Sequence, residues 1–175
     1  LNWEHAPFEI PEDIYDAWNA KDEGAKKEKV WEDLLETYKQ KYPEESNELE
    51  RRFNSEMTHE FNERFDDFLR DCSLQEDPIA TRKASQICLD HFCADLPELI
   101  GGSADLTGSN NTFSKHNTEL TPDNPDGSHI YYGVREFGMV TIMNGMSLHG
   151  GIRPYGGTFL VFMDYARNAV RLSAM

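Results

Sequence analysis

The sequence has 175 residues, with 17 Lys and Arg against 32 Asp and Glu and a net charge of −15. Its length suits one domain with an appendage, and its acidity argues against a nucleic-acid partner, because a phosphate backbone would be repelled. No apolar run approaches the roughly 20 residues of a membrane span. Three cysteines without metal-ligand spacing favour reduced thiols in a cytoplasmic protein.

Charge and glycine divide the chain near residue 77. Residues 1–77 contain 10 basic and 23 acidic residues, whereas residues 78–175 contain 7 and 9. Eleven of the twelve glycines lie in the second part. We therefore predict a helical interdomain connection over 1–77 and an α/β domain over 78–175. The first residue is not Met and no stop signal ends the last helical pattern, so we also expect a fragment of a longer protein.

The first part has apolar residues at helical spacing. Pro11 is suited to open a short helix, a second helical pattern covers 30–42, and Pro43 ends that helix or opens the next. Apolar residues then recur every four positions over 49–69, a spacing that drifts around a 3.6-residue helix. A break near Met57, with Thr58 as the N-cap, restores one apolar face.

The second part alternates helical and strand patterns. Asp77 and Pro78 predict a helix start, and a long polar loop is expected over 107–128. The strands are expected at 99–103, 130–132 and 152–159, and the helices at 78–96, 135–148 and 160–175. This order predicts a parallel α/β sheet flanked by helices. Ligands collect beyond the carboxyl ends of such strands, where Asp105, Ser109 and the segment before Glu136 could meet.

Glu136 is the leading candidate for chemistry. It starts a helix rich in Gly and Met whose following apolar residues carry no compensating charge, and such surroundings disfavour an ionised carboxylate. An acid of this kind serves as a proton donor or as a partner for a heterocycle. The alternative is a first-turn Glu that interacts only with the helix dipole.

Further candidates each have a plainer alternative. Arg82 and Ser109 together suit a phosphate, or they are a solvated arginine and a turn serine. Asp105 would accept from a ligand amine or form an Asx turn. Three aromatic side chains would form a wall for a flat ring or belong to the core; these are Phe159, Phe162 and Tyr165. His149 is either a ligand or a helix C-cap, and we favour the cap. No metal-binding motif is present.

The order of four segments resembles the transketolase family around the start of its pyrimidine-binding domain. These are residues 80–85 (ATRKAS), 99–110 (LIGGSADLTGSN), 133–139 (GVREFGM) and 154–160 (PYGGTFL), followed by Phe162 and Tyr165. The resemblance covers 78–175, and residues 3–11 resemble the segment joining the family's first and second domains. It implies the thiamine diphosphate-binding fold, here incomplete.

The resemblance also implies a function. Transketolases use thiamine diphosphate to move a two-carbon ketol unit from a ketose phosphate to an aldose phosphate in the pentose phosphate pathway. Glu136 would hydrogen-bond the aminopyrimidine N1′ as the catalytic acid. Phe162, with Phe159 and Tyr165, would bind the pyrimidine, and Asp105 would lie near the cofactor. Arg82 and Ser109 would bind the substrate phosphate.

Other parts of the family's site are expected outside this chain. A divalent metal, Mg or Ca, would be bound by the missing first domain, and each active site would combine two subunits of a homodimer. The fragment alone is therefore expected to be inactive. Three alternatives remain: dihydroxyacetone synthase, a deoxyxylulose-phosphate synthase-like enzyme, or a non-catalytic module whose acidic arm docks a partner.

Overall fold

The computed structural model describes residues 3–175, which form two compact units. The first unit ends at Asn47 and contains α1 (Glu12–Trp18) and α2 (Lys21–Lys41). Pro11 precedes α1, and Pro43 opens α3 (Pro43–Phe53), as its ring favours the first helical position. Neither α1 nor α2 buries a residue among those described. The second unit, Glu48–Met175, holds the candidate site and is described from here on.

The predicted break in the four-residue repeat is confirmed at Thr58. Its hydroxyl accepts a hydrogen bond from the Phe61 backbone N–H at 3.1 Å, which caps α4 (His59–Ser73). Phe61 is 7% exposed, and its ring packs against Phe65 and Phe92. A cap therefore directs the aromatic face of α4 onto α5 (Thr81–Asp95).

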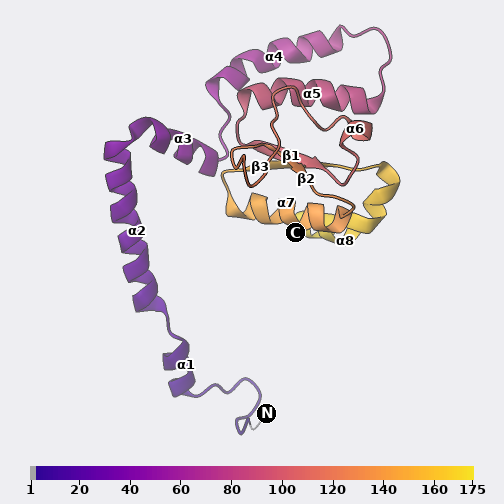
Figure 1. Ribbon diagram of the computed structural model, residues 1–175. Helices are drawn as coiled ribbons and strands as arrows, with labels where there is room; N and C mark the ends of the chain where they lie inside the picture. The colour runs from indigo at the N-terminus through magenta and orange to yellow at the C-terminus, as the bar shows by residue number, and fades with distance from the viewer. Residues whose placement is uncertain (1–2) are drawn as a thin grey trace. The chain divides into compact units, whose positions relative to one another are not determined.

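Three parallel strands form the sheet, in the order β2-β1-β3 (Figure 1). They are β1 (Leu99–Ser103), β2 (His129–Tyr131) and β3 (Arg153–Gly157). Helix α5 lies over one face, and α7 (Glu136–His149) and α8 (Met163–Ser173) lie over the other. Parallel strands require crossover connections, and α7 supplies the one from β2 to β3. The predicted fold class, a parallel sheet flanked by helices, is thus confirmed.

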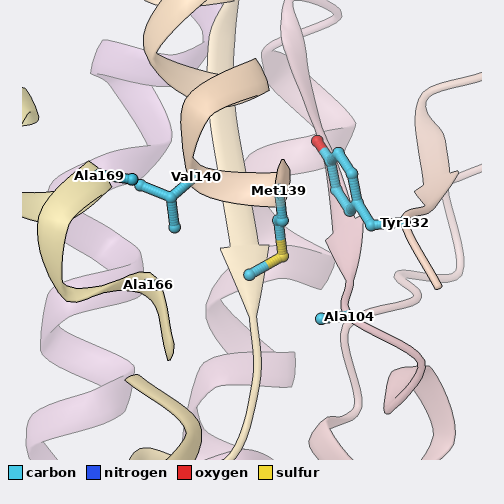
Figure 2. Packing of buried hydrophobic residues seen from close by; sticks show 6 residues of the cluster. All are labelled: Ala104, Tyr132, Met139, Val140, Ala166 and Ala169. Atoms are coloured by element: carbon cyan, nitrogen blue, oxygen red, sulfur yellow. The ribbon is translucent and has the colours of Figure 1, made fainter. Parts of the chain in front are cut away.

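Glycine lets α7 pack closely onto β3. A Cβ atom at Gly156 would lie 2.6 Å from the sulfur of Met143 and 3.0 Å from that of Met139. Met139 is 2% exposed and belongs to the main apolar cluster, whose other members are Ala104, Tyr132, Val140, Ala166 and Ala169 (Figure 2). Burying a side chain of this size contributes about 1.5–3 kcal/mol. This packing fixes the start of α7, where Glu136 lies.

An ionic cluster holds the amino-terminal edge of the sheet. The Glu98 carboxylate, just before β1, is 2% exposed and accepts bonds of 2.8 and 2.9 Å from the two terminal nitrogens of Arg51. Arg51 also bonds Glu48, and Arg153 Nε lies 3.5 Å from Glu98. Burial would raise the pKa of Glu98, but the Arg51 hydrogen bonds, a backbone hydrogen bond and the charges of Arg51 and Arg52 together outweigh burial and hold this pKa below its usual range.

Some predicted boundaries are wrong. Helix α5 begins at Thr81 rather than at Pro78, because Ala80 is extended, with ψ at 141°. Proline fixes only φ, which helical and extended backbone share. The expected loop contains a short helix, α6 (Thr107–Asn110), and the last helix is preceded by a 3₁₀ turn, η1 (Leu160–Phe162). Within residues 3–175, no helix is both long and apolar enough to cross a membrane.

Candidate functional site

Two pockets contain most of the predicted site residues. The first, which we call the Glu136 pocket, has a volume of about 530 Å³. It is lined by Val134, Arg135, Glu136, Phe137, Phe162 and Tyr165. The second, the Arg82 pocket, has a volume of about 710 Å³ and is lined by residues of α5, α6, β3 and the start of η1. Both volumes are typical of small-molecule sites.

Glu136 lies in the first turn of α7 and is 8% exposed. No hydrogen bond or ion pair within residues 3–175 engages its carboxyl group. The guanidinium of neighbouring Arg135 instead donates to the Tyr132 carbonyl at 2.8 Å. The Glu136 carboxyl oxygens are not among the fully buried polar atoms of the described residues, so they reach the pocket that the residue lines. The arrangement therefore leaves a lone acid facing a pocket with aromatic walls, and a ligand donor there would stabilise it.

The three aromatic residues form a row of neighbouring rings, in which Phe159 and Phe162 are stacked and Phe162 and Tyr165 are tilted at 41°. The ring centroids of Phe159 and Phe162 lie 5.7 Å apart at an interplanar angle of 29°, and those of Phe162 and Tyr165 lie 5.9 Å apart. Phe162 and Tyr165 line the Glu136 pocket, whereas Phe159 lines the Arg82 pocket. Offset rings at these distances attract one another and would accept a further flat ring.

Arg82 and Ser109 meet across the Arg82 pocket. Arg82 stands in the first turn of α5, and its Nη1 donates to the backbone carbonyl of Ser109 at 3.5 Å. Both residues are exposed. The guanidinium therefore has donors left for a ligand beside the Ser109 hydroxyl.

Asp105 lies in neither of these pockets. It follows β1 in a left-handed conformation, with φ at 61°, and is exposed. Aspartate tolerates this conformation because its short side chain bonds locally. The expectation that Asp105, Ser109 and the segment before Glu136 meet is not met within one pocket, since Ser109 lines the Arg82 pocket whereas Val134 and Arg135 of that segment line the Glu136 pocket. A His149 ring nitrogen lies 3.1 Å from the carbonyl of Gly150, which follows α7, so the contact reaches no carbonyl within the helix and the cap interpretation stays a prediction.

Several lining residues were not predicted. Val134 and Phe137 flank Glu136, and Thr112 and Tyr155 line the Arg82 pocket. Val134 and Phe137 lie in the 133–139 segment and Tyr155 lies in the 154–160 segment, so their positions in these two motifs could have identified them as site residues. Thr112 gave no signal, because its place depends on how the loop after α6 folds.

Comparison with known proteins places this arrangement in a class. A model described as "Transketolase, pyrimidine binding domain" matches residues 77–175, and one described as "Transketolase, thiamine diphosphate binding domain" matches residues 1–58. The chain thus has the fold of thiamine diphosphate-dependent enzymes.

Individual relatives agree. The chain is 49% identical over 175 residues to Transketolase 2 and 50% identical to Transketolase 1 of Vibrio parahaemolyticus, covering all of this chain and 26% of each relative. A Pichia stipitis transketolase complexed with sedoheptulose-7-phosphate superposes with a TM-score of 0.77 at 40% identity, covering 95% of this chain and 25% of that one. Transketolase from Leishmania mexicana superposes with a TM-score of 0.76 at 35% identity, covering 94% and 24%.

The chain belongs to the transketolase family. It spans about a quarter of the length of the curated relatives that it matches.

Proposed function

We propose that this chain is part of a transketolase that transfers a two-carbon ketol unit from a ketose phosphate to an aldose phosphate. The observation that carries the proposal is the Glu136 pocket, where a buried acid without a protein partner faces aromatic rings. The family membership supports it, as does the relative solved with a sugar phosphate. Enzymes of the pentose phosphate pathway perform this transfer.

The residues of the Glu136 pocket fit the aminopyrimidine ring of thiamine diphosphate. When bound, this cofactor supplies the carbanion chemistry. Glu136 would hydrogen-bond the pyrimidine N1′, because its carboxyl group lines the pocket and has no partner among the described residues. Phe162 and Tyr165 would orient the ring by offset stacking and exclude water. Phe159 would extend this wall toward the substrate, and Asp105 would act near the cofactor.

The Arg82 pocket would bind the phosphate of the sugar. Arg82 offers a planar fork of donors, and Ser109 adds a hydroxyl. In the full-length enzyme, Arg82→Ala should raise KM for phosphorylated sugars by about tenfold or more, since charge-assisted hydrogen bonds contribute about 1.5–3 kcal/mol. KM for unphosphorylated sugars should change little. Equal changes for both would count against a phosphate site.

The remaining parts would come from outside this chain. We propose that residues 1–77 connect the first domain to a pyrimidine-binding domain that starts at 78. The first domain would hold the diphosphate and a divalent metal, Mg or Ca. A homodimer would complete each site, and this chain alone would be inactive. A cytoplasmic location is consistent with three free cysteines among the described residues.

The test is a transfer assay on the full-length enzyme. Added thiamine diphosphate should start the conversion of a ketose phosphate and an aldose phosphate. Preference for an acceptor other than a sugar would favour dihydroxyacetone synthase. Preference for a donor other than a ketose phosphate would favour a deoxyxylulose-phosphate synthase-like enzyme. No thiamine diphosphate binding at all would favour a non-catalytic module.

A further inference from the structure

A buried polar network contacts Tyr155, one of the residues that line the Arg82 pocket. Asn117 is 7% exposed, and its side-chain oxygen accepts from the Ser114 backbone N–H at 2.9 Å. Its side-chain nitrogen donates to the Ser128 hydroxyl at 2.8 Å. The Tyr155 hydroxyl lies 3.1 Å from the same Asn117 oxygen. Because Ser114 N–H needs an acceptor, the orientation of the Asn117 amide is fixed.

The Tyr155 hydroxyl also reaches the turn that carries Ser109. Its single proton is shared between two acceptors, the backbone carbonyl of Thr112 at 3.0 Å and the Asn117 side-chain oxygen at 3.1 Å. Burial raises the pKa of Tyr155, so this hydroxyl keeps its proton. Thr112 in turn closes α6, because its own backbone N–H donates to the Thr107 carbonyl at 3.2 Å. The hydrogen bond from Tyr155 therefore holds the carboxyl end of the 107–112 turn in place.

The amino-terminal end of the 107–112 turn is attached to β3, the strand that contains Tyr155. The Ser103 hydroxyl donates to the Gly157 carbonyl at 2.8 Å and accepts from the Leu106 backbone N–H at 3.2 Å. Ser109 thus lies between two attachments to β3, one through Ser103 and one through Tyr155. Residues that are well held by such surrounding contacts position a binding group far more precisely than a free loop does.

We propose that Tyr155, supported by Asn117, is a positioning residue that holds Ser109 opposite Arg82 and so sets the affinity for a phosphate group. This inference rests on the proposed function of the Arg82 pocket. Tyr155 does not transfer a proton in this role. Its hydroxyl acts through the Thr112 carbonyl, and its loss would let the turn move away from the guanidinium.

The experiment compares variants of the full-length enzyme. Tyr155→Phe removes only the hydroxyl, and Asn117→Ser perturbs the same contact from the other side. Tyr132→Phe is the matched control, because its buried hydroxyl has no hydrogen-bond partner within residues 3–175. For each variant, KM and kcat are measured with a phosphorylated and an unphosphorylated ketose, and inorganic phosphate is titrated as a competitive inhibitor.

We expect Tyr155→Phe to raise KM for the phosphorylated ketose and the inhibition constant of phosphate by about 2–10-fold, the effect of one neutral buried hydrogen bond. Its kcat, its KM for the unphosphorylated ketose and all values of Tyr132→Phe should stay within about twofold of the parent. If Tyr155→Phe does not fold, Asn117→Ser decides by the same criterion.

Arg82→Ala separates this inference from the function on which it rests. If Arg82→Ala affects both ketoses equally, the phosphate site itself is wrong. The other outcome is that Arg82→Ala raises KM for the phosphorylated ketose alone. If Tyr155→Phe and Asn117→Ser then change KM for both ketoses equally or for neither, the positioning role is overturned. It is also overturned if neither variant folds, because the contact is then a determinant of folding only.

Discussion

The Arg51–Glu98 pair allows a quantitative prediction about the edge of the sheet. Arg51→Met keeps an extended apolar stem but leaves the Glu98 carboxylate, 2% exposed, without its bidentate partner. Removing one partner of a buried ion pair costs about 3–5 kcal/mol. Arg153 Nε remains 3.5 Å away and offsets part of this loss. We therefore expect the lower end of the range, about 3 kcal/mol.

Hydrogen exchange on the full-length enzyme measures this loss locally. The amides of β1 and of Arg153, whose N–H donates to the Glu98 carbonyl at 2.9 Å, should exchange about 10²-fold faster in Arg51→Met. Arg52→Met is the matched control. Arg52 pairs with Glu48 at side-chain exposures of 32% and 39%, so its removal should cost only about 0–1 kcal/mol. Similar exchange in the two variants would refute the argument.

Two other predictions concern acid and the cofactor. The pKa of Glu48 is lowered to about 2, first by the Arg51 hydrogen bond and also by Arg52, and the pKa of Glu98 is lowered as well. A lowered folded-state pKa contributes stability that is present above the unfolded value of about 4.5 and is lost as the pH falls toward 2. Acid titration followed by hydrogen exchange should show this loss in the parent, and a parallel loss in Arg51→Met would contradict it. Separately, Phe162→Leu should weaken thiamine diphosphate binding to the full-length apoenzyme by about 2–10-fold in a calorimetric titration, because one aromatic stacking contact contributes about 0.5–1.5 kcal/mol. Phe159→Leu, in the Arg82 pocket, should weaken thiamine diphosphate binding less. Equal losses of affinity in the two variants would argue against Phe162 as the residue that stacks on the pyrimidine.

Local rules recovered much of the fold from the sequence. The drift of a four-residue repeat required a break, and Thr58 provides the cap there. Alternating helix and strand patterns gave the parallel sheet, because such connections leave few other topologies. The start of α5 at Thr81 was missed, because Pro78 fixes φ while ψ at Ala80 decides where the helix begins.

The candidate site was only partly predictable. The chemistry of a guanidinium and a hydroxyl paired Arg82 with Ser109 as a phosphate site, and the structure places both residues at one pocket. The division of the aromatic residues between two pockets was not foreseen, since it depends on η1 turning into α8 at Met163. The Arg51–Glu98 pair was also missed. Its members are 47 residues apart, and sequence spacing contains no information about burial at that distance.

The central proposal is that the Glu136 carboxyl group hydrogen-bonds the pyrimidine ring of thiamine diphosphate and takes part in proton transfer there. The most direct measurement is kcat of Glu136→Gln in the full-length enzyme at saturating thiamine diphosphate. Asp164→Asn is the matched control, since Asp164 is also a first-turn acid but is exposed. We expect kcat to fall by about 10²-fold or more in Glu136→Gln and to stay near the parent value in Asp164→Asn. Turnover of Glu136→Gln within about twofold of the parent would contradict the claim, because loss of a proton-transfer group costs about 10²-fold.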